Sequence, residues 1–222
     1  MDLIELKNIS KTYGTKKKVT AIRKFNLAIK EGEMLAVMGR SGSGKSTVLN
    51  IIAGIDRPSG GEYRFEGNDM SELTDRQMTI FRRDNIGVVF QHFALVDDYT
   101  VYNNIAIPLR LCKTPKADID RRVCEIAEEF GIRKLLSKYP RELSGGEAQR
   151  TAIARAVIAR PKLILADEPT GALDEENGRR IMQVFKKLHN QGNTLVIVTH
   201  DPQIAAMCER TVHIKDGKNE SK

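Results

Sequence analysis

A glycine-rich segment with one lysine, GRSGSGKST, stands between the apolar run MLAVMG and the helix-like stretch KSTVLNIIAG. A buried strand before such a segment and a helix after it are the context of a phosphate-binding loop. Gly39, Gly42 and Gly44 let the backbone curl until its N–H groups converge on phosphate oxygens, and the helix start adds partial positive charge. Lys45 would supply a point charge for the β- and γ-phosphates, and Ser46 would offer a hydroxyl to Mg²⁺. The segment predicts a nucleotide-binding site.

Two adjacent acids, Asp167 and Glu168, follow the apolar run LILA. Open α/β sheets bind their ligands at the carboxyl ends of their strands, and these acids stand at such an end. Asp167 can hold Mg²⁺ through a water molecule. A second acid beside it is suited to activating a water molecule, so we predict that Glu168 is a general base.

Two further apolar runs end in polar residues: Gln91 follows IGVVF, and His200 follows LVIVT. A histidine there could contact a γ-phosphate, and a glutamine could orient Mg²⁺ or the attacking water, as it does in other nucleotide hydrolases. A lone histidine is more often structural, but four strand ends here carry residues suited to phosphate chemistry. The predicted catalytic residues are Glu168, His200 and Gln91, and the predicted metal ligands are Ser46, Gln91 and Asp167.

A second candidate phosphate-binding segment, LSGGEAQR, begins at Leu143. Its serine and two glycines precede the helix-like run AQRTAIARAVIAR, so Ser144, Gly145 and Gly146 would present backbone N–H groups at a helix start. One chain needs only one such loop for one nucleotide. The residues alone leave open what the second one holds.

The segments around these motifs alternate between strand and helix patterns, which favours a parallel sheet with helices on both faces. Apolar residues recur at every second position over residues 3–10 and 19–30, as in strands with one buried face. From about residue 97 to residue 142 the pattern changes to helices, first over VYNNIAIPLRLC and then over KADIDRRVCEIAEEFGI. Further helices are predicted over residues 45–53, 74–83, 148–160 and 177–191, the second of them opened by a capping box between Thr74 and Gln77.

The composition indicates a globular chain of the soluble class. Of its 222 residues, 41% are hydrophobic and 29% are charged, and its apolar runs are too short to span a bilayer. The first residues do not resemble a signal peptide, so we expect the protein to stay in the cytosol. The net charge of +7 fits either an anionic partner or a solvated basic surface. The three cysteines form no CxxC pair, which favours reduced thiols over disulfides or a zinc site: Cys112, Cys124 and Cys208.

With GRSGSGKST, Gln91, LSGGE, LADEPTGALD and His200 in this order, the chain resembles the ATP-binding subunits of ABC transporters from about residue 4 to residue 217. The resemblance implies an α/β fold with a P-loop NTPase core, an N-terminal antiparallel β subdomain and an inserted helical subdomain. It implies one domain over residues 1–222, with the core at 1–91 and 143–222 and the helical subdomain at about 92–142.

The resemblance also implies roles for single residues. Tyr13 matches the aromatic residue that stacks on adenine, and Gln91 matches the residue that links the nucleotide to a permease and flanks the groove for a permease helix. Asp174 matches a segment that touches the opposing subunit. Two copies would then close head to tail around two ATP·Mg²⁺, each presenting LSGGE to the ATP of the other. The implied nucleotide-binding residues are Tyr13, Gly39, Ser41, Gly42, Ser43, Gly44, Lys45, Ser46, Thr47, Ser144, Gly145, Gly146 and Asp174.

Within the family, GRSGSGKST and EPTGALD are most similar to the lipoprotein-release, macrolide-export and antimicrobial-peptide-resistance ATPases. We therefore expect an ATPase that drives a separate transmembrane permease from the inner face of the cell membrane. Ala148 and Gly171 depart from common family residues, but neither departure removes a catalytic group. The cargo is not predicted, because the permease selects it; export, extraction and signalling all fit.

The alternative is an ABC-type ATPase that acts on nucleic acid or the ribosome. Only the net charge of +7 supports it, and the chain has neither a long coiled coil nor a second cassette, so no nucleic acid partner is expected. A P-loop kinase would leave LSGGE unexplained.

Overall fold

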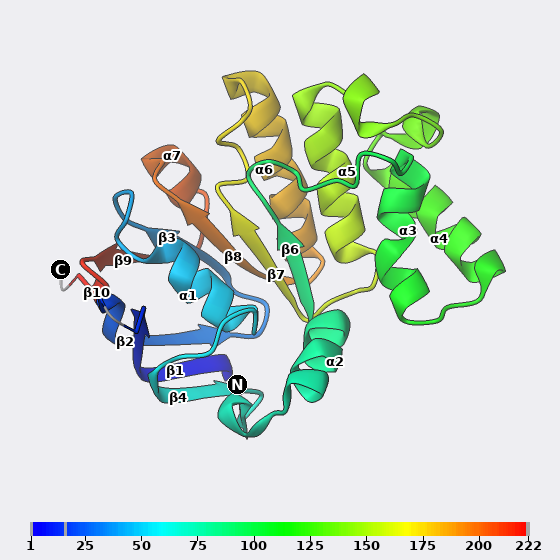
Figure 1. The fold of residues 1–222 in the computed structure, drawn as a ribbon. Coiled ribbons are helices and arrows are strands. Elements are labelled where there is room, and N and C mark those ends of the chain that lie inside the picture. The colour runs from blue at the N-terminus through cyan, green and yellow to red at the C-terminus, as the bar shows by residue number, and fades with distance from the viewer. Residues whose placement is uncertain (1, 16, 221–222) are drawn as a thin grey trace.

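The computed structural model describes residues 2–15 and 17–220, and it contains two β-sheets (Figure 1). The larger sheet has the strand order β10-β9-β3-β8-β7-β6. All pairs among its strands β3, β6, β7, β8 and β9 are parallel, whereas β10 is antiparallel to β9. The strands are β3 (Met34–Met38), β6 (Ile86–Val89), β7 (Leu163–Asp167), β8 (Thr194–Thr199), β9 (Arg210–Lys215) and β10 (Lys218–Asn219).

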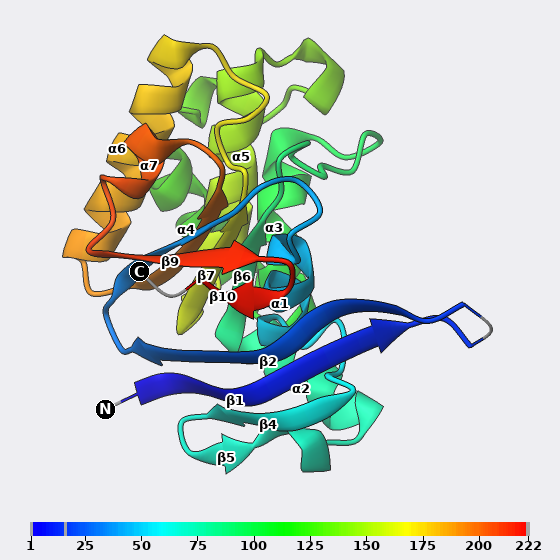
Figure 2. The same cartoon turned by 90° about the vertical axis from the view of Figure 1, so that its left-hand side faces the viewer.

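The smaller sheet is antiparallel and has the order β2-β1-β4-β5. Figure 2 shows it below β9, with α6 and α7 above that strand. The alternating pattern expected over residues 3–10 and 19–30 is confirmed, since both segments lie in this sheet. Its strands are β1 (Asp2–Tyr13), β2 (Val19–Lys30), β4 (Gly60–Phe65) and β5 (Asn68–Asp69).

Helices cover both faces of the larger sheet, as predicted. Helix α1 lies between the two sheets, whereas α5 and α6 pack on the opposite face (Figure 1). The strands are buried on both faces: along β7, Leu163 and Leu165 belong to the core around α1, and Ile164 and Ala166 belong to the core around α5 and α6. The helices are α1 (Lys45–Ile52), α2 (Asp75–Asn85), α3 (Val101–Leu111), α4 (Lys116–Glu129), α5 (Gly145–Val157), α6 (Glu175–Asn190) and α7 (Pro202–Ala205), with 3-10 turns η1 (Met70–Glu72), η2 (Arg133–Leu135) and η3 (Pro140–Glu142).

Two helices start with the same reciprocal cap. On α2, Thr74 and Gln77 form the capping box that their spacing predicts. On α5, Ser144 and Glu147 form another, so this helix begins at Gly145, three residues before the start expected from the apolar pattern. It ends at Val157 rather than at residue 160, because Arg160 is in the left-handed conformation, with a φ of 57°. The two glycines of LSGGE are therefore the first turn of α5.

The segment between β6 and α5 contains α3, α4 and the 3-10 turns η2 and η3, and the two α-helices pack into the core of the larger sheet. Buried residues of α3 and α4, such as Val101, Ile105 and Val123, share one apolar cluster with buried residues of α5 and α6. Helix α3 is capped at its start by Thr100, whose side chain accepts a hydrogen bond from the N–H of Asn103. The packing joins these helices directly to α5.

Gly87 lies where β6 crosses the end of α5, and it leaves no room for a side chain. A Cβ there would lie 2.4 Å from the carbonyl oxygen of Ala156 and 3.0 Å from Cγ of Pro161. We expect Gly87→Ala to lower the free energy of unfolding by about 1–3 kcal/mol, because backbone has to move. Urea denaturation measures this change. Gly60→Ala is the matched control, since a Cβ there meets open space; an equal loss in both variants would contradict the packing argument.

Candidate nucleotide-binding and catalytic site

The carboxyl edge of the larger sheet gathers the predicted residues in the order of its strands. Lys45 follows β3, His200 follows the neighbouring β8, Asp167 ends β7, and Gln91 follows β6. These side chains border one cavity of about 710 Å³. The lining residues are Ala21, Arg40, Ser41, Gly42, Gly44, Lys45, Ser46, Thr47, Gln91, Asp167, Glu168 and His200.

The loop between β3 and α1 has the curled backbone that a phosphate ligand requires. Gly44 caps α1 with a φ of 107°, and a Cβ there would lie 2.8 Å from the carbonyl oxygen of Ala21. Lys45 is only 9% exposed, and its ammonium donates to the carbonyl oxygens of Gly39 at 2.8 Å and Arg40 at 3.2 Å. The Lys45 ammonium is therefore held by two backbone carbonyl groups at a helix N-terminus. A positive charge at this place suits the binding of phosphate.

Ser46 and Asp167 meet at the wall of this cavity. The Ser46 hydroxyl donates to Oδ2 of Asp167 at 3.3 Å. Burial and the nearby charge of Glu168 raise the pKa of Asp167, so a cation at this point would stabilise its ionised form. A hydroxyl and a carboxylate are hard oxygen ligands, which fit Mg²⁺. Within residues 2–15 and 17–220, no three His, Cys, Asp or Glu side chains converge as a metal cluster.

Glu168 is held in a strained conformation beside His200. Its φ is 46°, and its backbone N–H donates to the carbonyl oxygen of Val198 at 2.9 Å. Its carboxylate oxygens lie 2.9 and 3.0 Å from Nδ1 of His200. The Glu168 side chain is 16% exposed and that of His200 is 70% exposed. Backbone strain of this kind occurs at functional sites, and it aims the carboxylate into the cavity.

Gln91 reaches the loop that follows Glu168. A Cβ on Gly171 would lie 2.9 Å from Nε2 of Gln91, so the two segments are in close contact. Gly171, which differs from the common family residue, thus lies beside a residue of the cavity. Any larger side chain there would displace the glutamine amide.

The second candidate phosphate segment does not line this cavity. Ser144 instead donates to Oε2 of Glu147 at 2.8 Å at the start of α5, and Asp174 caps the start of α6. The two helix starts are packed tightly, since a Cβ on Gly146 would lie 2.6 Å from Oδ1 of Asn177. In the described part of the chain, the two phosphate-binding segments therefore do not share a cavity.

Gly39 and Ser43 border an adjoining cavity of about 660 Å³ at the phosphate loop.

Tyr13 also lies outside the cavity lining, in a polar cluster that the sequence did not reveal. Its hydroxyl donates to Oδ2 of Asp56 at 2.7 Å, and burial together with this hydrogen bond raises the pKa of Tyr13. Lys11 forms an ion pair with Asp56, and its ammonium lies 4.9 Å from the centre of the Tyr13 ring. No local pattern links Asp56 to Lys11 and Tyr13, because tertiary packing alone brings them together.

Sequence patterns also missed two residues of the cavity itself. Arg40 occupies a position of the phosphate loop at which the motif accepts any residue, so its guanidinium carried no signal. Ala21 belongs to β2 and reaches the cavity only because the smaller sheet packs beside the loop.

Comparisons with known proteins agree with these motifs. The family model described as ABC transporter matches residues 22–171. The bacitracin export ATP-binding protein BceA of Halalkalibacterium halodurans is 40% identical over 98% of this chain and 87% of its own length. The macrolide export ATP-binding/permease protein MacB of Sodalis glossinidius is 41% identical over 97% of this chain, which spans 33% of that longer protein.

A solved structure is also similar: the ATP-binding cassette MJ0796, a dimer in a post-hydrolysis state bound to ADP and Pi. Its TM-score is 0.91 at 42% identity, over 98% of this chain and 97% of the other. No helix in residues 2–15 and 17–220 has the length and apolar content needed to cross a membrane. The nucleic-acid alternative finds no support among these relatives. By the family model and by relatives at 40% identity or more along nearly all of its length, this chain belongs to the ABC transporter family as an ATP-binding subunit.

Proposed function

We propose that two copies of this chain hydrolyse ATP with Mg²⁺ and so drive a separate membrane permease. One observation carries the proposal. The cavity gathers Lys45, Asp167 and Glu168, yet the second phosphate-binding segment of the same chain lies outside it, at the start of α5. A site that needs both segments is then complete only when a second copy supplies the missing one.

The cavity residues have separate tasks in this proposal. The backbone of residues 39–44 and the ammonium of Lys45 bind the phosphates. Tyr13, which lies outside the cavity lining, stacks on the adenine, as the family resemblance implies. Ser46 and Asp167 hold Mg²⁺ with the help of Gln91. When bound, Mg²⁺ neutralises charge on the phosphate oxygens. Residues 1–91 and 143–222 form the nucleotide-binding core, and residues of about 92–142 form a helical unit.

Glu168 takes the proton of the attacking water. Its carboxylate is aimed at the cavity by the left-handed backbone at that residue and by the contact with Nδ1 of His200. His200 also lines the cavity, and we expect its ring to contact the terminal phosphate. Water attacks the terminal phosphorus of ATP, the bond to ADP breaks, and Glu168 gives its proton to solvent.

The partner copy contributes Ser144, Gly145 and Gly146 to the same nucleotide, and Asp174 lies at the contact between the copies. Two observations support this. The start of α5 presents backbone N–H groups beside the start of α6, and the similar cassette MJ0796 is a dimer in its post-hydrolysis state. Each chain then supplies half of two composite sites.

The names of the similar proteins support a role in export. BceA is named for bacitracin export, and MacB is named as a combined ATP-binding and permease protein for macrolide export. We propose that the partner of this chain is a separate transmembrane permease, with the chain bound to it at the inner face of the cell membrane. The resemblance to the lipoprotein-release and macrolide-export ATPases implies a permease that carries an extracytoplasmic domain.

Phosphate release by the purified chain tests the proposal. We expect Mg²⁺-dependent turnover whose rate per chain rises with protein concentration, because each site needs two copies. Chelation of Mg²⁺ by EDTA is expected to stop it. Turnover that is independent of Mg²⁺, or that is constant per chain over a hundred-fold dilution of an initially active sample, would contradict the proposal. Affinity capture from detergent extract adds the partner: a polytopic membrane protein is expected, whereas rRNA or DNA would favour the alternative.

A further inference from the structure

The turn after β6 contains two consecutive residues with left-handed backbone, Phe93 with a φ of 62° and Ala94 with a φ of 48°. This conformation is unfavourable for residues other than glycine and persists only where surrounding contacts hold it. Two local hydrogen bonds close the turn, from the N–H of Phe93 to the carbonyl of Phe90 at 3.1 Å and from the N–H of Ala94 to the carbonyl of His92 at 2.6 Å. Neither bond uses the carbonyl oxygens of Phe93 and Ala94.

Arg155 of α5 binds both of these carbonyls. Its Nη1 donates to the carbonyl oxygen of Ala94 at 2.6 Å, and its Nη2 donates to that of Phe93 at 3.0 Å. Burial lowers the pKa of the Arg155 guanidinium, so its environment opposes the charge. Both acceptors are neutral carbonyls, and the planar fork of arginine fits two neighbouring acceptors as lysine cannot. The contact therefore stabilises one particular shape of the turn.

The same turn touches the start of α5. A Cβ on Gly145 would lie 3.9 Å from Cζ of Phe93 and 3.1 Å from Cδ2 of Leu173, so the Phe93 ring lies beside the first residue of the helix. At its other end, the turn begins with Gln91, which lines the nucleotide cavity. One short segment thus contacts the chain's own cavity and the helix start outside that cavity.

We infer that Arg155 is a positioning residue that holds the 91–94 turn with Phe93 against Gly145, and so links a chain's own nucleotide cavity to the helix start that completes its partner's site. This inference rests on the proposed pair of copies. Helix α5 carries both Gly145 and Arg155, so the turn contacts this one helix at two places. A shift of Gln91 on nucleotide binding then moves the helix start with it.

The test compares two affinities in the Glu168→Gln background, in which bound ATP persists. Arg155→Met keeps the apolar stem and removes both hydrogen bonds. We expect a fluorescent ATP analogue to bind single chains within about two-fold of the parent, whereas ATP-driven dimer formation weakens by about ten-fold or more. Arg155→Lys is expected to restore part of the dimer formation. A general loss of structure would lower both affinities together.

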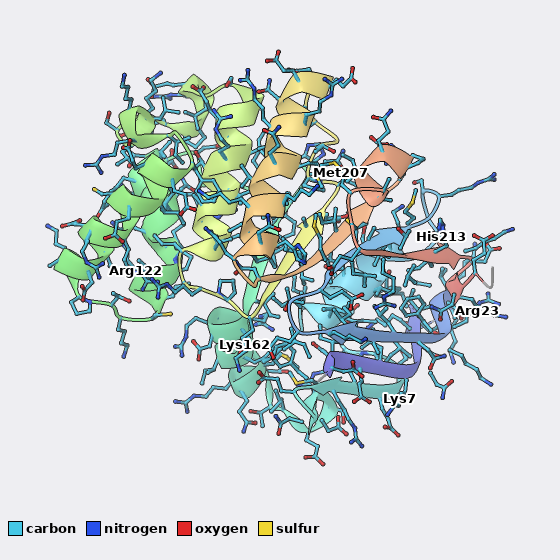
Figure 3. The ribbon with its side chains drawn as sticks, turned by 180° about the vertical axis from the view of Figure 1, so that it is seen from behind. Lys7, Arg23, Arg122, Lys162, Met207 and His213 are labelled. Atoms are coloured by element: carbon cyan, nitrogen blue, oxygen red, sulfur yellow. The ribbon has the colours of Figure 1, made fainter. Side chains whose placement is uncertain are left out.

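Arg122→Met is the matched control. Arg122 also donates to a backbone carbonyl, that of Ile158, but it does so from α4. Figure 3 shows Arg122 among the helices, at the opposite end of the molecule from the labelled Arg23 and His213. We expect this variant to form dimers as the parent does. Equal weakening in both arginine variants, or normal dimer formation by Arg155→Met, would overturn the inference. Phe93→Ala is expected to weaken dimer formation too, and adding Arg155→Met to it should cause little further loss, because both changes break one link.

Hydrogen exchange separates this inference from the proposed function. If the parent Glu168→Gln chain binds ATP but never dimerises, the proposed pair of copies is wrong, and exchange on single chains still decides the role of Arg155. We expect Arg155→Met to speed exchange in residues 91–96 and also in residues 143–148, while Arg122→Met changes neither. Faster exchange in the first segment alone, or in neither segment, would overturn the link.

Discussion

Replacing Glu168 by glutamine is expected to lower ATP turnover by about 10²–10⁴-fold while ATP still binds, because the variant loses the group that accepts the proton of water. Glutamine has the same shape, and its amide oxygen can keep the contact with Nδ1 of His200, now 2.9 Å from the carboxylate. The residues that bind phosphate and Mg²⁺ are untouched. Steady-state phosphate release measures the turnover, and a fluorescent ATP analogue measures the binding. Size exclusion with ATP should show a dimer that persists, since the nucleotide is no longer consumed.

Glu66→Gln provides the matched control for this change. Glu66 forms an ion pair with Lys162 on the surface, away from the cavity, and its replacement should leave turnover within about two-fold of wild type. Near wild-type turnover by Glu168→Gln would refute the role of Glu168 as general base. Loss of ATP binding in the same variant would instead show that its carboxylate holds the nucleotide.

Mixing two inactive variants is expected to restore activity. Lys45→Ala removes the phosphate-binding ammonium, and Ser144→Arg places a bulky cation at the start of α5, so each variant alone should be almost inactive. In a mixed pair, one site combines both defects and the other combines the intact Lys45 of one copy with the intact Ser144 of its partner. Half of the pairs in an equal mixture are mixed, so about one quarter of wild-type turnover is expected if the sites act independently. Phosphate release from the mixture measures it.

Thr74→Arg controls for the loss of a helix cap. Thr74 forms the same capping box on α2 that Ser144 forms on α5, so both changes remove an equivalent cap, at a cost of about 1 kcal/mol in stability. We expect Thr74→Arg to retain turnover, and we expect it to complement neither inactive variant beyond its own activity. Absence of any gain on mixing Lys45→Ala with Ser144→Arg, when both are folded, would mean that the second segment does not serve the partner's site.

Much of this fold could be predicted from residues that are close together in the chain. The capping box at Thr74 follows from side chains three residues apart, and the two-sided burial of β7 follows from a continuous apolar run. The phosphate loop was predicted in the same way, since its glycines, Lys45 and the helix after it are contiguous. Each of these structures is stabilised by hydrogen bonds and side-chain contacts within a few residues, so each can be recognised from a short stretch of sequence.

The limits of α5 could not be predicted as well, because two signals compete there. The apolar pattern favours a start at Ala148, whereas the reciprocal hydrogen bonds of Ser144 and Glu147 extend the helix back to Gly145. At the other end, the left-handed backbone of Arg160 stops a pattern that would otherwise continue. Apolar spacing reports the buried face of a helix, and caps decide its ends.

By itself, the amino-acid sequence determined the family, the kind of fold and the residue types suited to phosphate chemistry, because these depend on contiguous motifs. Only the tertiary structure decided which of these residues share a cavity. The strand order β3-β8-β7-β6 places Lys45, His200, Asp167 and Gln91 side by side, and it leaves Ser144 outside. It also brought Arg155 to the carbonyls of Phe93 and Ala94, which lie far from it in the chain. Contacts between distant segments depend on how sheets and helices pack, and no short stretch of sequence records that arrangement.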